Sequence, residues 1–409
     1  MPEPRRNAAI ELTRRILVPD PVKAARSAQA PDLGPRILFF SGGSALRDTA
    51  ARLTAYTSNS IHVITPFDSG GSSAKLRQAF HMPAIGDMRY RIMALADQTL
   101  RGNPEVVALF AHRLPKDADR PALLAELDAM AAGDHRLVAS IPDPMRKIIR
   151  NHLYDFLRAM PGDFDLRGAS LGNLVLTAGY LANRRQLDPV LYIFSQLVQA
   201  RGVVRPVVNK HLHLTARLAD GSLTPRQHQL TGKECGPIAS KVADVWLSAP
   251  DEPETPVDVD IRDKTVRLIA SADLICYPIG SFYSSVAANL LPRGVGRAVA
   301  ANPCPKVYIP NPGPDPETPG CSVGELAETL VRYARRHDPE LAPTDLLDLV
   351  LVDTRGGTYP GGLEPERIQA LGARVLDLDL TAPSGGPAGE NAPPRMDPDR
   401  LARVLISLA

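Results

Sequence analysis

Three stretches of this chain combine glycines with small hydroxyl side chains, a combination that suits phosphate groups. They are Ser41–Ser44, Asp68–Ser73 and Gly280–Ser285, which we name the first, second and third glycine junctions. Each follows an apolar run typical of a buried strand and precedes a helical pattern. Amides at a helix start and small hydroxyls both donate hydrogen bonds to phosphate oxygens. The sequence therefore predicts a phosphate-bearing ligand at the carboxyl ends of parallel strands.

Charged side chains accompany the second junction. Asp68 stands where an acid takes a ribose hydroxyl in dinucleotide-binding folds, and beside a diphosphate it could instead hold a divalent cation. Lys75 and Arg77 could offset phosphate charge. The first junction reads SGGSA and lacks the GxGxxG spacing, so nothing indicates nicotinamide or flavin redox chemistry.

A further acid, Asp87, follows a proline–glycine turn and begins a helix, where exposed amides stabilise a carboxylate. Met88 and Ile92 belong to the apolar stripe of that helix, whereas Arg89 and Arg91 are expected to point elsewhere. The plainer alternative is that the glycines only make tight turns and that Asp87 only caps its helix. Three junctions in succession favour the ligand-binding interpretation.

The elements that must position these residues alternate between strands and helices, which predicts an α/β fold with right-handed crossovers. Residues 1–34 indicate a short helix (Ala8–Leu17) and a Pro/Ala/Ser-rich linker. Residues 35–380 form the predicted main domain, with a helical insertion at about 104–165. Residues 381–409 are predicted to be a linker and a C-terminal helix.

Other patterns are weaker. Residues 227–231 resemble a strand, and residues 251–260 resemble a polar loop. His211 and His213 alternate on one strand face and could form a metal pair, but no third ligand is apparent. Gly168–Gly172 places Ser170 in a G-x-S-x-G pattern, yet no buried strand precedes it and no His/Asp partners follow, so a glycine-rich helix start near a ligand fits better.

Bulk properties exclude several classes of protein. The 409 residues are 44% hydrophobic and 22% charged, with a net charge of +2, so there is no overall basic field for nucleic acid. Four cysteines without CxxC spacing make structural zinc improbable and indicate reduced thiols. The N-terminus has no apolar signal core, and no apolar stretch is long enough to span a membrane. We therefore expect a soluble cytoplasmic protein.

Several longer motifs resemble the family that joins phospholactate transferases of deazaflavin-coenzyme biosynthesis (CofD) with YvcK-type gluconeogenesis factors. The resemblance runs from about residue 36 to 380. Five motifs of the family have counterparts in this chain. They are GGGTG at Ser41–Ala45, DDGGSSGRLR at Phe67–Arg77, PGDIR at Ile85–Arg89, GHSxGNL at Gly168–Leu174 and ADLIxxGPGSLYTSxxPNLL at Ala272–Leu291. The last two matches are specific enough to make chance similarity unexpected.

This resemblance implies a Rossmann-like sheet with a binding crevice, a homodimer, and transfer of a phospholactyl group from a guanosine diphospho donor to a deazaflavin alcohol with Mg²⁺. Asp68 would be the acid of the metal or diphosphate site, and Arg77, Asp87 and Arg89 are further candidate catalytic residues. Asn173 and Asn311 would contact base, sugar or acceptor. The implied cradle for the nucleotide diphosphate consists of Gly42, Gly43, Ser44, Gly70, Gly71, Ser72, Ser73, Gly280 and Ser281.

The chain departs from the family pattern at three places. Phe67 replaces the first of two loop acids and removes one candidate Mg²⁺ ligand, and Ala169 replaces a family histidine. The loop that begins at Asn311 (NPGPDPET) is shorter than the family's NxMTQPGET. The sequence therefore leaves two functions open, a Mg²⁺-dependent transferase and a non-catalytic nucleotide or nucleotide-sugar sensor of the YvcK type.

Overall fold

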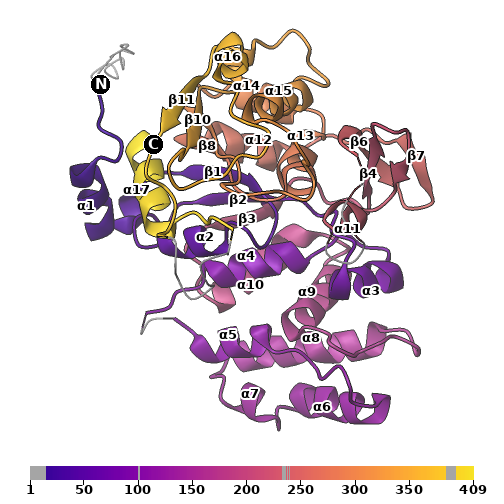
Figure 1. Ribbon diagram of the computed structural model, residues 1–409. Helices are drawn as coiled ribbons and strands as arrows, with labels where there is room; N and C mark the ends of the chain where they lie inside the picture. Colours follow the sequence, from indigo (N-terminus) through magenta and orange to yellow (C-terminus); the bar gives the residue numbers. More distant parts are fainter. Residues whose placement is uncertain (1–14, 100–101, 233–235, 237, 239, 384–392) are drawn as a thin grey trace, which may run out of the picture.

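The centre of the molecule is a seven-stranded sheet in which each strand runs parallel to its neighbours (Figure 1). The computed structural model describes residues 15–99, 102–232, 236, 238, 240–383 and 393–409. The strand order is β11-β10-β9-β8-β1-β2-β3. These strands are β1 Ile37–Ser41, β2 Ile61–Ile64, β3 Val203–Pro206, β8 Leu274–Tyr277, β9 Lys306–Tyr308, β10 Leu349–Val352 and β11 Arg374–Asp377. The predicted Rossmann-like α/β sheet is confirmed.

Strand β1 lies at the point where the direction of winding reverses. The chain adds β2 and β3 on one side of β1, and later adds β8 to β11 on the other. Leu38 pairs with Ile61 of β2 and with Ile275 of β8. Ligands of open α/β sheets bind at such a switch point, beyond the carboxyl ends of the strands. The three glycine junctions follow β1, β2 and β8, so this topology brings them together.

Helices cover both faces of the sheet because successive side chains of a strand point to opposite faces. Leu38 and Phe40 belong to one core cluster, which includes helix α15 (Val323–Ala334). Ile37 and Phe39 belong to another, with α2 (Arg47–Leu53) and the C-terminal helix α17 (Pro398–Leu408). All five residues of β1 are buried, as the continuous apolar run predicts.

A block of helices separates β2 from β3 and fills the stretch predicted as a helical insertion (Figure 1, lower half). Its members share one core cluster, in which Phe110 stacks on Phe194 with ring centroids 4.1 Å apart. The helices of this block are α5 Pro104–Ala111, α6 Arg120–Ala132, α7 Arg136–Ala139, α8 Met145–Ala159, α9 Leu171–Ala182 and α10 Leu187–Leu197.

A smaller antiparallel sheet, β5-β4-β6-β7, lies between β3 and β8 in the sequence. Its strands are β4 His213–Leu218, β5 Leu223–Thr224, β6 Val242–Ala249 and β7 Glu252–Pro256. Two expectations were wrong here. Residues 251–260 contain the edge strand β7, whose mostly exposed side chains give no apolar alternation. Residues 227–230 form a single helical turn, α11, because a short apolar–polar run does not distinguish a strand from a turn of helix.

The predicted linker before residue 35 was also wrong in part, because it contains α1 (Pro21–Gln29). Asp20 caps this helix by accepting hydrogen bonds from the amides of Val22 and Lys23. Residues 8–14 of the predicted helix Ala8–Leu17 lie outside the described residues, and residues 15–17 are not helical.

The remaining helices follow the strands. They are α3 Gly71–Phe80, α4 Gly86–Ala94, α12 Asp263–Ala270, α13 Ala288–Leu290, α14 Val295–Ala300 and α16 Pro365–Ala370, with short 3₁₀ turns η1 Pro31–Leu33 and η3 Pro343–Asp345 and a π-helical turn η2 Phe282–Ala287. Within the described ranges no helix has the length and apolar character needed to cross a bilayer. Cys276, Cys304 and Cys321 are free thiols, and Cys235 lies outside those ranges.

Candidate functional site

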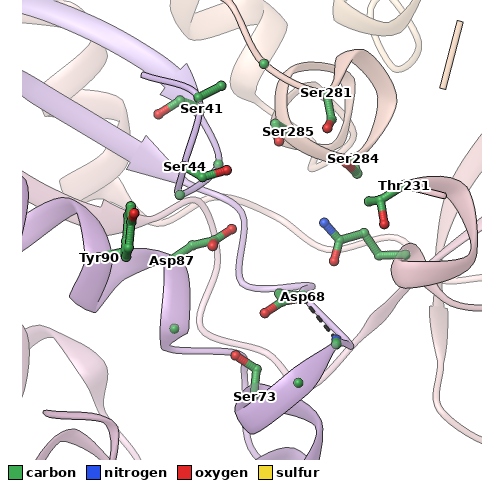
Figure 2. Close-up of a pocket in the computed structure, with 18 of the residues that line it drawn as sticks. Ser41, Ser44, Asp68, Ser73, Asp87, Tyr90, Thr231, Ser281, Ser284 and Ser285 are labelled. Atoms are coloured by element: carbon green, nitrogen blue, oxygen red, sulfur yellow. Dashed lines mark hydrogen bonds between the residues drawn. The ribbon is translucent and has the colours of Figure 1, made fainter. Parts of the chain in front are cut away.

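A cavity of about 380 Å³ lies at the carboxyl ends of β1, β2 and β8, where the three glycine junctions meet (Figure 2). Most of the residues predicted from the sequence line it. They are Gly42, Gly43, Ser44, Asp68, Gly70, Gly71, Ser72, Ser73, Asp87, Arg89, Asn173, Gly280 and Ser281. Arg77 and Asn311 do not line this cavity.

The first junction owes its shape to close packing against Asp87. A Cβ on Gly43 would lie 2.2 Å from Asp87 Oδ1, and a Cβ on Gly42 would lie 2.5 Å from Ser285 Oγ. Any side chain at either position would therefore displace a polar group of the cavity wall. The glycines are required here for close approach, since neither has a positive φ.

Arg91 holds the first junction from behind, which contradicts the expectation that this side chain points away from the core. It is fully buried and donates to the carbonyls of Leu46 at 2.9 Å, Gly42 at 3.0 Å and Gly43 at 3.3 Å. Burial lowers the pKa of Arg91 to about 10, so the guanidinium stays charged at neutral pH. A cation beneath carbonyl oxygens fixes how the glycine peptides are turned.

Two carboxylates from different elements face the cavity, Asp68 after β2 and Asp87 in the first turn of α4 (Figure 2). Asp68 Oδ1 accepts a hydrogen bond from the Gly70 amide at 3.0 Å. A Cβ on Gly86 would lie 2.5 Å from Ser73 Oγ and 3.8 Å from Asp68 Oδ2. The glycine before Asp87 therefore lets α4 approach the second junction.

These acids fit the way in which Mg²⁺ is bound at phosphate sites. Among the described residues no group of three or more His, Cys, Asp or Glu side chains could hold a metal ion. The histidine pair His211 and His213, with ring centroids 6.0 Å apart, thus gains no third protein ligand within those residues. Mg²⁺ often uses only one or two carboxylates and takes its other ligands from substrate phosphates and water.

The cationic side chains that line the cavity differ in part from those that the sequence suggested. Arg89 lines it, is nine-tenths buried and donates to the Phe110 carbonyl at 3.2 Å. Burial lowers its pKa to about 10. Arg113, which sequence reasoning missed, also lines the cavity and donates to the Gly168 carbonyl at 3.1 Å. It comes from the helical block, and no local pattern distinguishes it from a surface arginine.

Lys75 and Arg77 belong to the supporting structure instead. Lys75 Nζ lies 2.8 Å from Asp165 Oδ2 and 2.8 Å from the Arg167 carbonyl. Arg77 is buried and donates to the carbonyls of Phe67 at 2.9 Å, Asp68 at 2.8 Å and Leu212 at 2.6 Å. Its guanidinium therefore fixes the backbone that carries Asp68, and it does not reach the cavity.

At the third junction the helix amides are already occupied by a buried carboxylate. Glu317 Oε2 accepts from the amides of Tyr283 and Ser284, each at 2.8 Å, and Oε1 accepts from the Ser284 hydroxyl. Burial raises the pKa of Glu317, and the neighbouring Asp315 adds to that rise. These amides consequently do not serve a phosphate, although the hydroxyls of Ser281, Ser284 and Ser285 line the cavity.

Asn311 completes the same arrangement. Its Oδ1 accepts from the Gly280 amide at 2.9 Å, and its Nδ2 donates to the Gly280 carbonyl at 2.8 Å. Asp315 Oδ2 accepts from the Phe282 amide at 2.9 Å. The loop after β9 thus hydrogen-bonds to backbone groups of the third junction. Asn311 is engaged in these bonds and does not lie at the cavity wall.

The remaining side of the cavity is built from residues that sequence reasoning missed. Gln227, His228 and Thr231 line it from α11 and its C-terminal end. Asn173, in the first turn of α9, donates from Nδ2 to Ser72 Oγ at 3.0 Å. The sequence pattern at residues 227–231 predicts a strand, and sequence reasoning therefore missed Gln227, His228 and Thr231. Only the tertiary fold brings this turn to the second junction.

Two of the three departures from the family motifs, Phe67 and Ala169, are packed into the core. Phe67 is fully buried in the cluster beneath the second junction, and Ala169 is 4% exposed in the helical cluster. Neither position offers a polar group to the cavity. The second junction therefore supplies one carboxylate, Asp68, where the family motif has two acids.

Comparison with known proteins agrees with this architecture. A family model described as 2-phospho-L-lactate transferase CofD matches residues 37–379. The chain belongs to the CofD family. The predicted resemblance is thereby confirmed over the sheet and all three glycine junctions.

The similar proteins carry a second name. The chain is 28% identical over 387 residues to the gluconeogenesis factor of Bacillus subtilis, covering 91% of this chain and 98% of that protein. It is 27% identical over 278 residues to the gluconeogenesis factor of Listeria monocytogenes, covering 68% and 66%. A UPF0052-family protein of Bacillus halodurans has the same fold, with a TM-score of 0.66 at 20% identity over 91% and 98% of the two chains.

Proposed function

We propose that this CofD-family protein transfers a phosphorus-containing group of the phospholactyl type from a nucleoside diphospho donor to an acceptor hydroxyl, with Mg²⁺. One observation carries the proposal. Asp68 and Asp87, from separate elements, face one cavity beside the first two glycine junctions. Carboxylates next to amide-rich helix starts are the groups that a metal-bound diphosphate needs.

In this reaction the acceptor oxygen forms a bond to the distal phosphorus of the donor. The bond from that phosphorus to the bridging oxygen breaks, and the nucleoside monophosphate leaves. The hydroxyl proton passes to Asp87 or to water. When bound, Mg²⁺ would be held by Asp68 and the diphosphate and would neutralise developing charge. Arg89 adds a positive charge at the same wall, and the protein otherwise contributes positioning.

A turnover assay tests the proposal directly. Purified protein with Mg²⁺ and guanosine diphospho or uridine diphospho donors should release nucleoside monophosphate when a deazaflavin alcohol or a comparable hydroxyl acceptor is present. Asp68→Asn should lower that rate at least about 100-fold, as expected for loss of a metal-bound phosphoryl-transfer site. Lys75→Met, which removes a cation turned towards Asp165, is the matched control and should retain activity. No transfer by the wild-type protein with any donor would refute the proposal.

Two observations favour a second candidate, a nucleotide or nucleotide-sugar sensor without turnover. The buried Phe67 leaves the second junction a single carboxylate. The similar proteins of Bacillus and Listeria, moreover, are named gluconeogenesis factors. A sensor should bind GDP or UDP-sugars tightly without product and with little dependence on Mg²⁺. Calorimetry with and without Mg²⁺ separates it from the transferase.

The predicted homodimer and cytoplasmic location stay predictions. Sedimentation velocity of the full chain should show one species with twice the mass of the 44.1 kDa chain. A monomer at micromolar concentration would contradict the dimer and would leave the proposed reaction untouched, because all the residues invoked above belong to one chain.

A further inference from the structure

The walls of the cavity differ in charge. On the α4 side the lining includes Asp87, Arg89 and Tyr90. On the opposite side, marked by Thr231 in Figure 2, the lining residues of α11 and its end are Gln227, His228 and Thr231, none of which carries a permanent charge. A diphosphate with its cation has strong partners on the first side and at the first two junctions. It has weak ones on the α11 side, which suits an uncharged part of a ligand.

Gln227 has an unmet hydrogen-bonding capacity at this wall. Its side chain lines the cavity and is 8% exposed, and its Oε1 has no hydrogen-bond partner within the described ranges. A buried polar atom without a partner destabilises a protein, so natural proteins keep few of them. Rotation of the terminal amide by 180° exchanges Oε1 and Nε2, so the side chain that lines the cavity can offer a ligand either an acceptor or a donor.

His228 ties this wall to the second junction. The Ser69 hydroxyl oxygen accepts from the His228 amide at 3.2 Å and lies 2.9 Å from His228 Nδ1. If the hydroxyl gives its single proton to Nδ1, the neutral imidazole carries its own proton on Nε2. The ring then presents a donor, while the adjacent Gln227 amide can donate and accept. Because Ser69 directly follows Asp68 in the chain, this contact fixes the α11 wall relative to the second junction.

We infer that Gln227 and His228 determine ligand specificity by hydrogen bonding to the uncharged part of the ligand attached to its diphosphate. That part is either the polar edge of a nucleobase or the hydroxyls of a sugar, which share neutral N–H and O–H groups. The inference rests on the proposed function, since it requires a nucleotide-type ligand. Amide side chains such as glutamine both donate and accept, so they discriminate between such groups without a charge.

Calorimetry with Mg²⁺ and five probes tests the inference: pyrophosphate, GDP, UDP, UDP-glucose and UDP-N-acetylglucosamine. Gln227→Leu should weaken binding of the preferred nucleotide about five- to tenfold, the effect of losing one neutral hydrogen bond. It should leave pyrophosphate unchanged, because that probe has no uncharged part. The melting temperature of the ligand-free variant should be equal or higher, since an orphan polar atom is removed.

Gln229→Leu is the matched control. Gln229 lies on the same turn and its Oε1 also lacks a partner, but it does not line the cavity. This variant should bind all five probes as the wild type does. Ser69→Ala, which releases His228, should weaken binding of the same probes that Gln227→Leu weakens and leave pyrophosphate unchanged.

The two sources of neutral groups give different patterns. If Gln227→Leu already binds GDP or UDP more weakly than the wild type does, the α11 wall contacts the base or ribose. If only its affinity for the UDP-sugars falls, the wall contacts the sugar. Either pattern supports the inference. If Gln227→Leu binds nucleotides as tightly as Gln229→Leu does, the inference is overturned and the proposed function still stands. A wild-type protein that binds pyrophosphate and no nucleotide would overturn both.

Discussion

The second and third glycine junctions look alike in sequence but differ in what holds their helix starts. At the second, the carboxylate that bonds to the Gly70 amide is Asp68, which belongs to the junction and faces the cavity. At the third, Asp315 and Glu317 come from the loop after β9, and Glu317 is fully buried. An acid beside a glycine–hydroxyl pattern is therefore a site group in one case and a structural cap in the other.

The difference lies in where the carboxylate comes from. A helix start attracts a carboxylate as readily as a phosphate, because both are anions that accept amide hydrogen bonds. Where the chain supplies that anion from a distant, buried loop, the amides are satisfied and only the hydroxyls remain for a ligand. Of the three phosphate cradles that the sequence predicts, the third is thus a hydroxyl-lined wall, and the first two stay predictions.

Removing the structural cap should have the largest effect. Glu317→Ala leaves two buried amides and the Ser284 hydroxyl without an acceptor, so we expect a loss of about 3 kcal/mol in the free energy of unfolding. Urea denaturation measures it. The control Glu328→Ala removes a half-exposed partner of Arg367 and should cost less than about 0.5 kcal/mol. Equal stability of the two variants would show that Glu317 is not the cap described above.

Filling the first junction should affect binding more than stability. Gly43→Ala drives a methyl group against Asp87 Oδ1, so nucleotide affinity should fall at least about tenfold, with a stability loss of about 1–3 kcal/mol from overpacking. Gly162→Ala, where a Cβ meets no atom within 4 Å, is the control. Calorimetry with GDP or UDP provides the readout. Undiminished affinity in Gly43→Ala would place the ligand elsewhere.

The last effect concerns pH. Burial raises the pKa of Glu317 from 4.5 to about 7, so the folded protein binds this proton more tightly than the unfolded chain. The resulting contribution to stability is full below pH 4.5 and is lost as pH rises through the raised pKa. Glu317→Gln keeps an acceptor oxygen but does not titrate. Its unfolding free energy should therefore fall less between pH 5 and 7 than that of the wild type, and an unchanged slope would contradict the assignment.

The sequence predicted the parallel sheet and most of the cavity lining because both follow from short-range patterns. Apolar runs such as Ile37–Ser41 mark buried strands, and the glycine pairs after them mark tight junctions. The parallel topology then requires that junctions after neighbouring strands meet. This explains why Asp68 and Asp87 were found without any knowledge of the tertiary contacts.

What the sequence did not predict depends on long-range packing. Arg77 and Arg91 have the appearance of surface cations, yet each is buried against three backbone carbonyls that lie far away in the sequence or across a loop. Gln227 and His228 line the cavity only because the tertiary fold brings α11 against Ser69 of the second junction. No local spacing distinguishes such residues from their neighbours.

The central claim is that the cavity binds a diphosphate through the second junction with Mg²⁺, and one titration tests it most directly. Isothermal calorimetry should show that the wild-type protein binds GDP or UDP in the presence of Mg²⁺, and that chelation of the metal weakens binding at least about tenfold. Asp68→Asn should bind equally weakly with and without the metal. Tight binding to Asp68→Asn that still depends on Mg²⁺ would contradict the claim.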